Sequence, residues 1–191
     1  VYVTLGGAGR LLRFDAASRQ QTGSLALGPT PRAVAVSASG GRVLVTRFVS
    51  PEHQAQVWDV DAAAFTLTRT LAIPKFGGDA NRDSTAGGGG VANYLAAIAI
   101  APDGASAWVA ATKVNNERGL LTGPDLDQDN TVRTIVAQLD LASNAFVRAI
   151  DLDNGDSASA LGFSPLGDYL LVTLQGNNEL VVIDTLAAVG A

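Results

Sequence analysis

Apolar and polar residues alternate along most of the chain in short runs, and glycine or proline interrupts these runs about every ten residues. Alternation with a period of two residues predicts β-strands with one buried face, and the recurring breakers predict tight turns between the strands. No long segment holds the 3.6-residue apolar stripe of an amphipathic helix. The pattern therefore predicts an all-β protein.

One hairpin pattern occurs three times and aligns without a gap, over residues 34–46, 98–110 and 161–173. The three turns carry a glycine at the same position: Gly40, Gly104 and Gly167. A second marker, an aspartate after an apolar strand, recurs as Asp15, Asp61, Asp140 and Asp184, at spacings of 46, 79 and 44 residues. The underlying period is about 44 residues, and repeats of this length built from four short strands are typical of β-propeller blades.

We name the four strands of a blade A to D, from the propeller axis outward. The chain then starts at a B strand and ends after a C strand, with blade segments at 1–30, 31–74, 94–152 and 158–191. The fourteen predicted strands are 1–5, 10–14, 20–27, 32–36, 42–48, 54–60, 66–73, 95–100, 105–111, 134–139, 146–152, 158–163, 168–174 and 178–183. We therefore predict a partial ring of four-stranded antiparallel blades, about three and a half in number.

Two insertions interrupt this repeat, at 75–93 and 112–133. The first joins a D strand to the next A strand, and the second joins B to C within the third blade. Because each strand reverses the direction of the one before it, both kinds of connection open on the same face of a propeller. We expect the two insertions, and the D-to-A connection at 151–156, to be neighbours on that face.

The composition is that of a folded chain, with 47% hydrophobic and 16% charged residues among 191. No apolar run is long enough to cross a bilayer, and no signal-peptide pattern is present. The chain contains no methionine and starts inside an apparent strand. We therefore expect a piece of a longer protein.

The absence of cysteine excludes disulfides, thiolate nucleophiles, cysteine-ligated zinc and covalently attached haem within this chain. The net charge is −5 and no basic block occurs, so the chain lacks the electrostatic pattern of a nucleic-acid-binding protein.

A catalytic triad would have to use His53, the single histidine, which we expect on an exposed loop. Trp58 and Trp108 lie in strands and are expected in the core rather than as sugar platforms.

Oxygen side chains alternate with other residues in both insertions. The candidate ligands are Asp79, Asn81 and Asp83 in the first insertion, and Asp125, Asp127 and Asp129 in the second. Calcium takes six to eight oxygen ligands, and such alternation can aim several oxygens at one point. The second loop begins like an EF-hand but has Asn130 where glycine normally turns the chain. Two interpretations stay open: at least one bound calcium ion, or solvated turns in which Asp and Asn bond their own backbone.

The repeats resemble those of bacterial surface β-propellers of the YVTN type, named for a Tyr-Val-Thr-Asn signature. Tyr2-Val3-Thr4 matches that signature, with Leu5 in place of the asparagine. The segment 182–185 (Val-Ile-Asp-Thr) and the hairpin turns at 101–104 and 164–167 match the other two elements of the repeat. This resemblance implies a secreted or cell-surface, extracytoplasmic module that binds a protein or surface ligand and is not an enzyme.

A narrower resemblance covers residues 93–133, which look like the propeller portion of secreted bacterial proteins that also carry a di-haem cytochrome peroxidase-like domain. That domain requires Cys-x-x-Cys-His, which this chain lacks. The alternative to a binding module is therefore the propeller segment of a redox enzyme whose haem domain lies outside this chain. The open ends of the ring also suggest self-association through unpaired blade edges.

Overall fold

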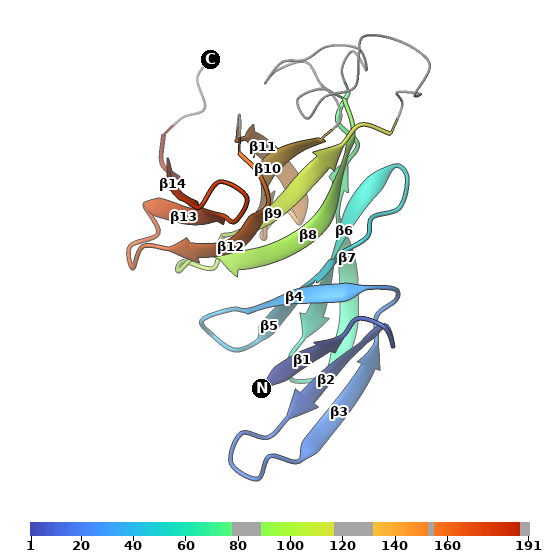
Figure 1. Ribbon diagram of the computed structural model, residues 1–191. Coiled ribbons are helices and arrows are strands. Elements are labelled where there is room, and N and C mark those ends of the chain that lie inside the picture. The colour runs from blue at the N-terminus through green and yellow to red at the C-terminus, as the bar shows by residue number, and fades with distance from the viewer. Residues whose placement is uncertain (78–88, 117–131, 153–154, 188–191) are drawn as a thin grey trace.

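The computed structural model describes residues 1–77, 89–116, 132–152 and 155–187 (Figure 1). Across these ranges the chain forms fourteen β-strands and no helix. The strands are β1 (Tyr2–Leu5), β2 (Arg10–Phe14), β3 (Gln21–Ala26), β4 (Pro31–Val36), β5 (Arg42–Arg47), β6 (Gln54–Asp61), β7 (Thr66–Pro74), β8 (Val91–Ile100), β9 (Ser106–Val114), β10 (Val132–Asp140), β11 (Ala145–Asp151), β12 (Ala158–Phe163), β13 (Tyr169–Leu174) and β14 (Glu179–Asp184). None of the described segments contains a helix long and apolar enough to cross a membrane.

The strands form four antiparallel sheets in chain order: β1-β2-β3, β4-β5-β6-β7, β8-β9-β10-β11 and β12-β13-β14. The sheets follow one another in an arc, and the inner strands β4, β8 and β12 lie in succession (Figure 1). The first sheet lacks an A strand and the fourth lacks a D strand among the described residues, as the repeat pattern predicts. The fold is a partial β-propeller, and the predicted fold class is confirmed. We refer to the four sheets as blades 1 to 4.

The predicted start of the first insertion, at residue 75, agrees with the end of β7 at Pro74. The other three insertion boundaries are wrong by two or three residues. Residues 91–93 belong to β8, residues 112–114 to β9, and residues 132–133 to β10. Val114 pairs with Val91 on one side and with Val132 on the other, so three strands of blade 3 continue together beyond the usual blade length. The hydrophobic repeat could not reveal this extension because it has no counterpart in the other blades.

The turn markers behave as the sequence predicts. Gly40, Gly104 and Gly167 all adopt left-handed backbone angles, with φ of 73°, 73° and 79°, a region that favours glycine. The recurring aspartates bond the amides of their own turns. The Asp140 carboxylate accepts from the Ser143 amide at 2.6 Å, and the Asp184 carboxylate accepts from the Ala187 amide at 3.0 Å.

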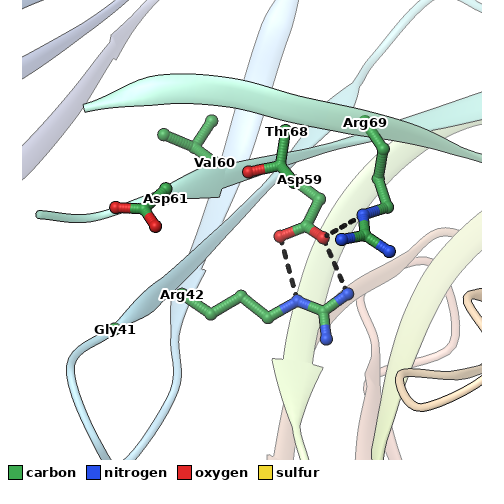
Figure 2. A pocket seen from close by; sticks show the side chains of 7 residues that line it. All are labelled: Gly41, Arg42, Asp59, Val60, Asp61, Thr68 and Arg69. Carbon is green, nitrogen blue, oxygen red and sulfur yellow. Dashed lines mark hydrogen bonds and ion pairs between the residues drawn. The ribbon is translucent and has the colours of Figure 1, made fainter. Parts of the chain in front are cut away.

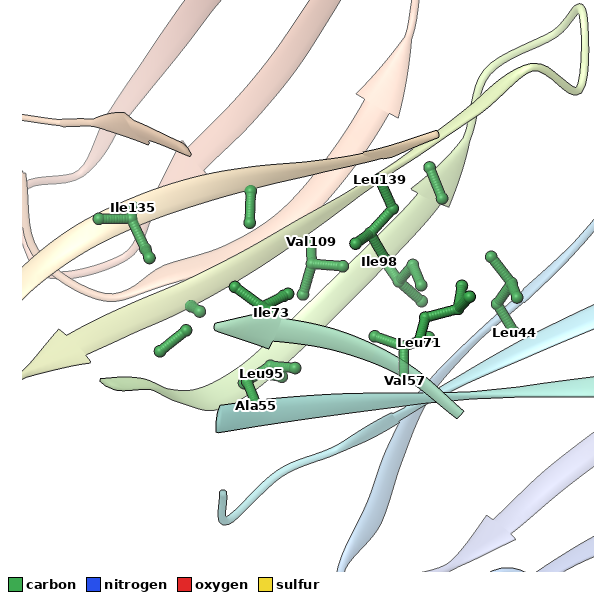
Figure 3. Close-up of a cluster of buried hydrophobic side chains, with 14 of the residues drawn as sticks. Leu44, Ala55, Val57, Leu71, Ile73, Leu95, Ile98, Val109, Ile135 and Leu139 are labelled. Atoms are coloured by element: carbon green, nitrogen blue, oxygen red, sulfur yellow. The ribbon is translucent and has the colours of Figure 1, made fainter. Parts of the chain in front are cut away.

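The core lies between neighbouring blades, because each sheet packs its apolar face on the next sheet. The largest cluster joins blades 2 and 3 and includes Leu44, Leu71, Ile98 and Leu139 (Figure 3). Trp58 belongs to the cluster between blades 1 and 2, and Trp108 to the one between blades 3 and 4. Their exposed fractions are 4% and 1%, so both tryptophans are core residues, as predicted.

Polar ties also join consecutive blades. The Thr4 hydroxyl of β1 donates to the Arg32 carbonyl of β4 at 2.7 Å, and the equivalent Thr46 hydroxyl of β5 donates to the Leu95 carbonyl of β8 at 2.9 Å. Threonine at this position of the B strand therefore bonds the A strand of the following blade. Ala110 takes the place of threonine in blade 3, so this tie does not recur between blades 3 and 4.

Candidate functional site

A concavity with a volume of about 310 Å³ opens where the inner strands of blades 2, 3 and 4 begin. We call it the axial concavity. It lies on the face that bears both insertions, because its walls are the starts of A strands and the ends of B strands. Its size is at the lower end of the range for small-molecule sites, about 300–1,000 Å³.

The axial concavity is built from equivalent positions of three blades. Three lining residues are equivalent in the aligned repeats and lie on the inner strands β4, β8 and β12. They are Arg32, Ala96 and Ser159. The position just after the usual end of the B strand contributes Phe48, Thr112 and Gln175. Two residues earlier in the chain, blades 3 and 4 contribute Tyr94 and Ser157. The backbone framework thus repeats while the side chains differ, which gives the concavity a cationic and aromatic wall and a wall of hydroxyl and amide groups.

Three side chains form the cationic and aromatic wall. The rings of Phe48 and Tyr94 lie 5.4 Å apart between centroids, at an interplanar angle of 50°. The Arg32 guanidinium carbon lies 5.4 Å from the centroid of Phe48, within the range of a cation–π interaction. Tyr94 is 47% exposed, so a ligand can reach its ring.

Backbone hydrogen bonds hold this wall in place. The Phe48 amide donates to the Thr30 carbonyl of its own blade at 2.8 Å, and the Phe48 carbonyl accepts from the Leu95 amide of the next blade at 3.3 Å. The Gln175 amide donates to the Ser157 carbonyl in the same way, at 3.1 Å. The aromatic wall therefore belongs to the rigid framework of strands.

Tyr94 adopts a left-handed backbone conformation, with φ of 50°. Bulky residues rarely adopt this region. Thr30 and Ser157, the equivalent residues before β4 and β12, adopt it too, with φ of 56° and 57°. Near these residues the pairing of each A strand with its B strand shifts register, between Asn93 and Ala97 in blade 3. The conformation therefore belongs to the repeat, and in blade 3 it places an aromatic ring at the rim of the concavity.

The bases of the two insertions lie beside the concavity, as expected. The Asn116 amide side chain donates to the Glu52 carbonyl at 2.9 Å, and the Ser50 hydroxyl donates to the Ala92 carbonyl at 2.7 Å. The Asp156 amide donates to the Asn177 side chain at 2.6 Å. The first bond joins two B-to-C connections, and the other two each join a B-to-C to a D-to-A connection. Among the described residues, both kinds of connection therefore lie on one face, as predicted.

A buried group of charges secures the extended strands of blade 3. The Lys113 ammonium lies 3.2 Å from one Asp151 carboxylate oxygen, and the Arg133 guanidinium Nε lies 3.0 Å from the other. Lys113 and Arg133 are only 8% and 7% exposed. Buried charges are tolerated only when paired, so Asp151 compensates the cations that accompany the insertion-bearing strands.

A second concavity, on the opposite face, contains an ion-pair group (Figure 2). The Asp59 carboxylate accepts two hydrogen bonds from Arg42, at 2.9 and 2.7 Å, and the Arg69 guanidinium Nε lies 3.3 Å from it. Arg42 also donates to the Leu141 carbonyl and the Asn144 side chain of blade 3, both at 2.9 Å. This group joins blades 2 and 3. The Nε and both terminal nitrogens of Arg42 all donate hydrogen bonds, which marks the group as a structural tie.

The six candidate metal ligands, Asp79, Asn81, Asp83, Asp125, Asp127 and Asp129, all lie outside the described residues. Within the described residues, no group of three or more His, Asp or Glu side chains could hold a metal ion. The calcium hypothesis therefore stays a prediction. His53 is exposed, with 78% of its side chain accessible, and lies 3.9 Å from the equally exposed Glu52.

Two of the recurring aspartates have perturbed acidity. Side-chain and backbone hydrogen bonds from Ser143 lower the pKa of Asp140. Backbone and side-chain hydrogen bonds from Ser18 likewise lower the pKa of Asp15. Donation to the charged form of a carboxyl favours that form. Both aspartates are in C-to-D turns on the face opposite the axial concavity, so these shifts stabilise turns.

The axial concavity is not visible in the sequence alone. Arg32, Phe48 and Tyr94 are separated along the chain, and each looks unremarkable in its own strand. A signal was present in the aligned repeats. Arginine occupies a position that holds alanine and serine in blades 3 and 4, and phenylalanine occupies one that holds threonine and glutamine.

No protein-family model matches this chain, and no curated protein matches it. Among solved structures, the hydrazine synthase of Kuenenia stuttgartiensis is similar to this chain, with a TM-score of 0.75 at 16% sequence identity. The likeness covers 96% of this chain and 49% of that chain, so this chain spans about half the length of that neighbour. At this identity the likeness supports the propeller-like fold and nothing finer.

Proposed function

We propose that this chain is a non-enzymatic binding module of the YVTN type, which presents the face of the axial concavity to a protein or surface ligand outside the cytoplasm. The observation that carries the proposal is the contrast between a repeated framework and varied side chains in the axial concavity. Packing between blades repeats, whereas Arg32, Phe48 and Tyr94 have no counterparts of the same chemistry in the other blades.

The described chemistry of this face favours binding over catalysis. A nucleophile, a general base and an orienting group within hydrogen-bond reach would mark a catalytic site. Among the described residues, the lining of the axial concavity offers one guanidinium, two aromatic rings, hydroxyls and an amide, with no carboxylate and no imidazole. Such groups orient and recognise a ligand.

A second candidate function comes from the comparison with solved structures. The similar structure belongs to a protein named as a synthase, and about half of that chain lies outside the likeness. On this alternative, the chain is the propeller segment of a redox enzyme, and the insertion-bearing face docks a haem domain.

The sequence of the gene on both sides of the codons for Val1 and Ala191 separates the two candidates. Further blades and a signal peptide, without a haem motif, are expected for an extracytoplasmic binding propeller. A Cys-x-x-Cys-His motif in the same reading frame would overturn the binding-module proposal in favour of the redox enzyme.

A further inference from the structure

The axial concavity has one cationic side chain and a group of neutral polar ones. Within the described part of the chain, no ion pair or hydrogen bond engages the Arg32 guanidinium, which contacts the Phe48 ring. Asp156 precedes the lining residue Ser157 in the chain, but it is not part of the lining. It accepts a hydrogen bond from the Ser157 hydroxyl at 2.8 Å.

A carboxylate is the ligand group that this arginine fits. A guanidinium presents parallel N–H donors that match the two oxygens of a carboxylate, and such charge-assisted pairs are stronger than neutral hydrogen bonds. The contact with the Phe48 ring, 5.4 Å from its centroid, restricts the side-chain freedom of Arg32. Less side-chain freedom is then lost when a ligand binds.

The remaining groups fit the rest of a small polyhydroxylated ring. The Tyr94 hydroxyl and the Gln175 carboxamide make no hydrogen bond within the described residues, and both line the concavity. Hydroxyl groups donate and accept, and a carboxamide does both through separate atoms. Sugar hydroxyls have the same dual character. The half-exposed Tyr94 ring supplies an apolar surface for the carbon face of a pyranose.

We propose that the axial concavity binds a sugar that carries a carboxylate, such as a hexuronate residue. Arg32 pairs with the carboxylate, Tyr94 packs against the ring, and Gln175 bonds ring hydroxyls. A volume of about 310 Å³ accommodates one such residue. The inference rests on the proposed function and specifies its ligand class.

The test is isothermal titration calorimetry of the chain with glucuronate, glucose, acetate and a tetrapeptide with a free C-terminal carboxylate. We expect saturable binding of glucuronate, at least tenfold weaker binding of glucose and acetate, and no tighter binding of the peptide. Arg32→Ala should weaken glucuronate binding at least tenfold, whereas Arg69→Ala, a matched change on the opposite face, should leave it unchanged. Near-ultraviolet circular dichroism verifies that both variants fold.

Absence of glucuronate binding, equal binding of glucose, tighter binding of the peptide, or an unaffected Arg32→Ala variant would each overturn the inference. Tyr94→Ala gives a second measure if Arg32→Ala fails to fold: loss of the ring that packs against the sugar should weaken binding several-fold. These binding outcomes test the sugar ligand alone and do not depend on whether the gene encodes a haem motif. The binding-module proposal fails separately, when the reading frame encodes Cys-x-x-Cys-His.

Discussion

The ion-pair group between blades 2 and 3 offers a stability prediction that can be worked from the structure. The Asp59 side chain is 5% exposed and forms ion pairs with two arginines, of which Arg42 is 25% exposed and Arg69 is 45% exposed. Arg42 alone reaches the next blade. The contributions of the two arginines should therefore be very unequal.

Removing one member of a buried pair leaves the other charge uncompensated, which costs about 3–5 kcal/mol. We expect Arg42→Ala to cost about 3 kcal/mol or more, because it leaves the Asp59 carboxylate buried and also breaks the bonds to Leu141 and Asn144. Asp59→Ala should cost about 3 kcal/mol, since Arg42 keeps its partners in blade 3. Arg69→Ala should cost less than about 1 kcal/mol, as exposed pairs do.

The assay is urea unfolding followed by tryptophan fluorescence. Trp58 reports on the cluster between blades 1 and 2 and Trp108 on the cluster between blades 3 and 4, so Trp58→Phe and Trp108→Phe backgrounds resolve the two sides of the ion-pair group. The double variant Arg42→Ala/Asp59→Ala should be more stable than the sum of the single losses predicts, by about 1–3 kcal/mol. Equal costs for Arg42→Ala and Arg69→Ala, or additive losses in the double variant, would refute the reasoning.

Three further predictions concern the turns and the insertions. Gly104→Ala should lower the unfolding free energy by about 1 kcal/mol in a urea titration, because the backbone φ at Gly104 is 73° while the space around it is open. The control is Gly41→Ala, at a turn glycine without a positive φ, which should change the unfolding free energy little. Equal effects of the two substitutions would contradict this prediction. The lowered pKa of Asp15 and Asp140 means that their contribution to stability is present above about pH 4 and is lost as the pH falls through the folded-state pKa. Ser143→Ala should therefore raise the pKa of Asp140 toward its usual range, as followed by carboxyl carbon NMR, and an unchanged titration would rule out Ser143 as the cause. Calorimetric titration of calcium should show saturable binding that Asp127→Ala abolishes and Asp103→Ala, in a hairpin turn, preserves; no heat at millimolar calcium would remove the calcium hypothesis.

The repeat made the fold predictable. Strands such as β2, predicted at 10–14 and found at Arg10–Phe14, follow from local alternation and from turn residues with one conformational role. The glycine and aspartate markers work because a left-handed turn or an amide-capping carboxylate needs few other residues. At these positions, the conformation that the residue itself prefers is also the one that the whole fold requires.

The site was not predictable in the same way. Arg32, Phe48 and Tyr94 acquire a shared role only when two blades pack side by side, and no motif spacing encodes that packing. The extension of β8, β9 and β10 is missed for a related reason: mutual pairing stabilises residues 91–93 and 112–114, and that pairing is not visible in either segment alone. Side-chain differences between aligned repeats were the one accessible signal.

A crystal structure of the chain with glucuronate would test the central claim most directly, because it locates the ligand without reference to affinity. The account predicts a sugar in the axial concavity, with its carboxylate within hydrogen-bond distance of the Arg32 guanidinium and its ring against Tyr94. A sugar bound elsewhere, or an axial concavity that stays empty at saturating glucuronate, would contradict it.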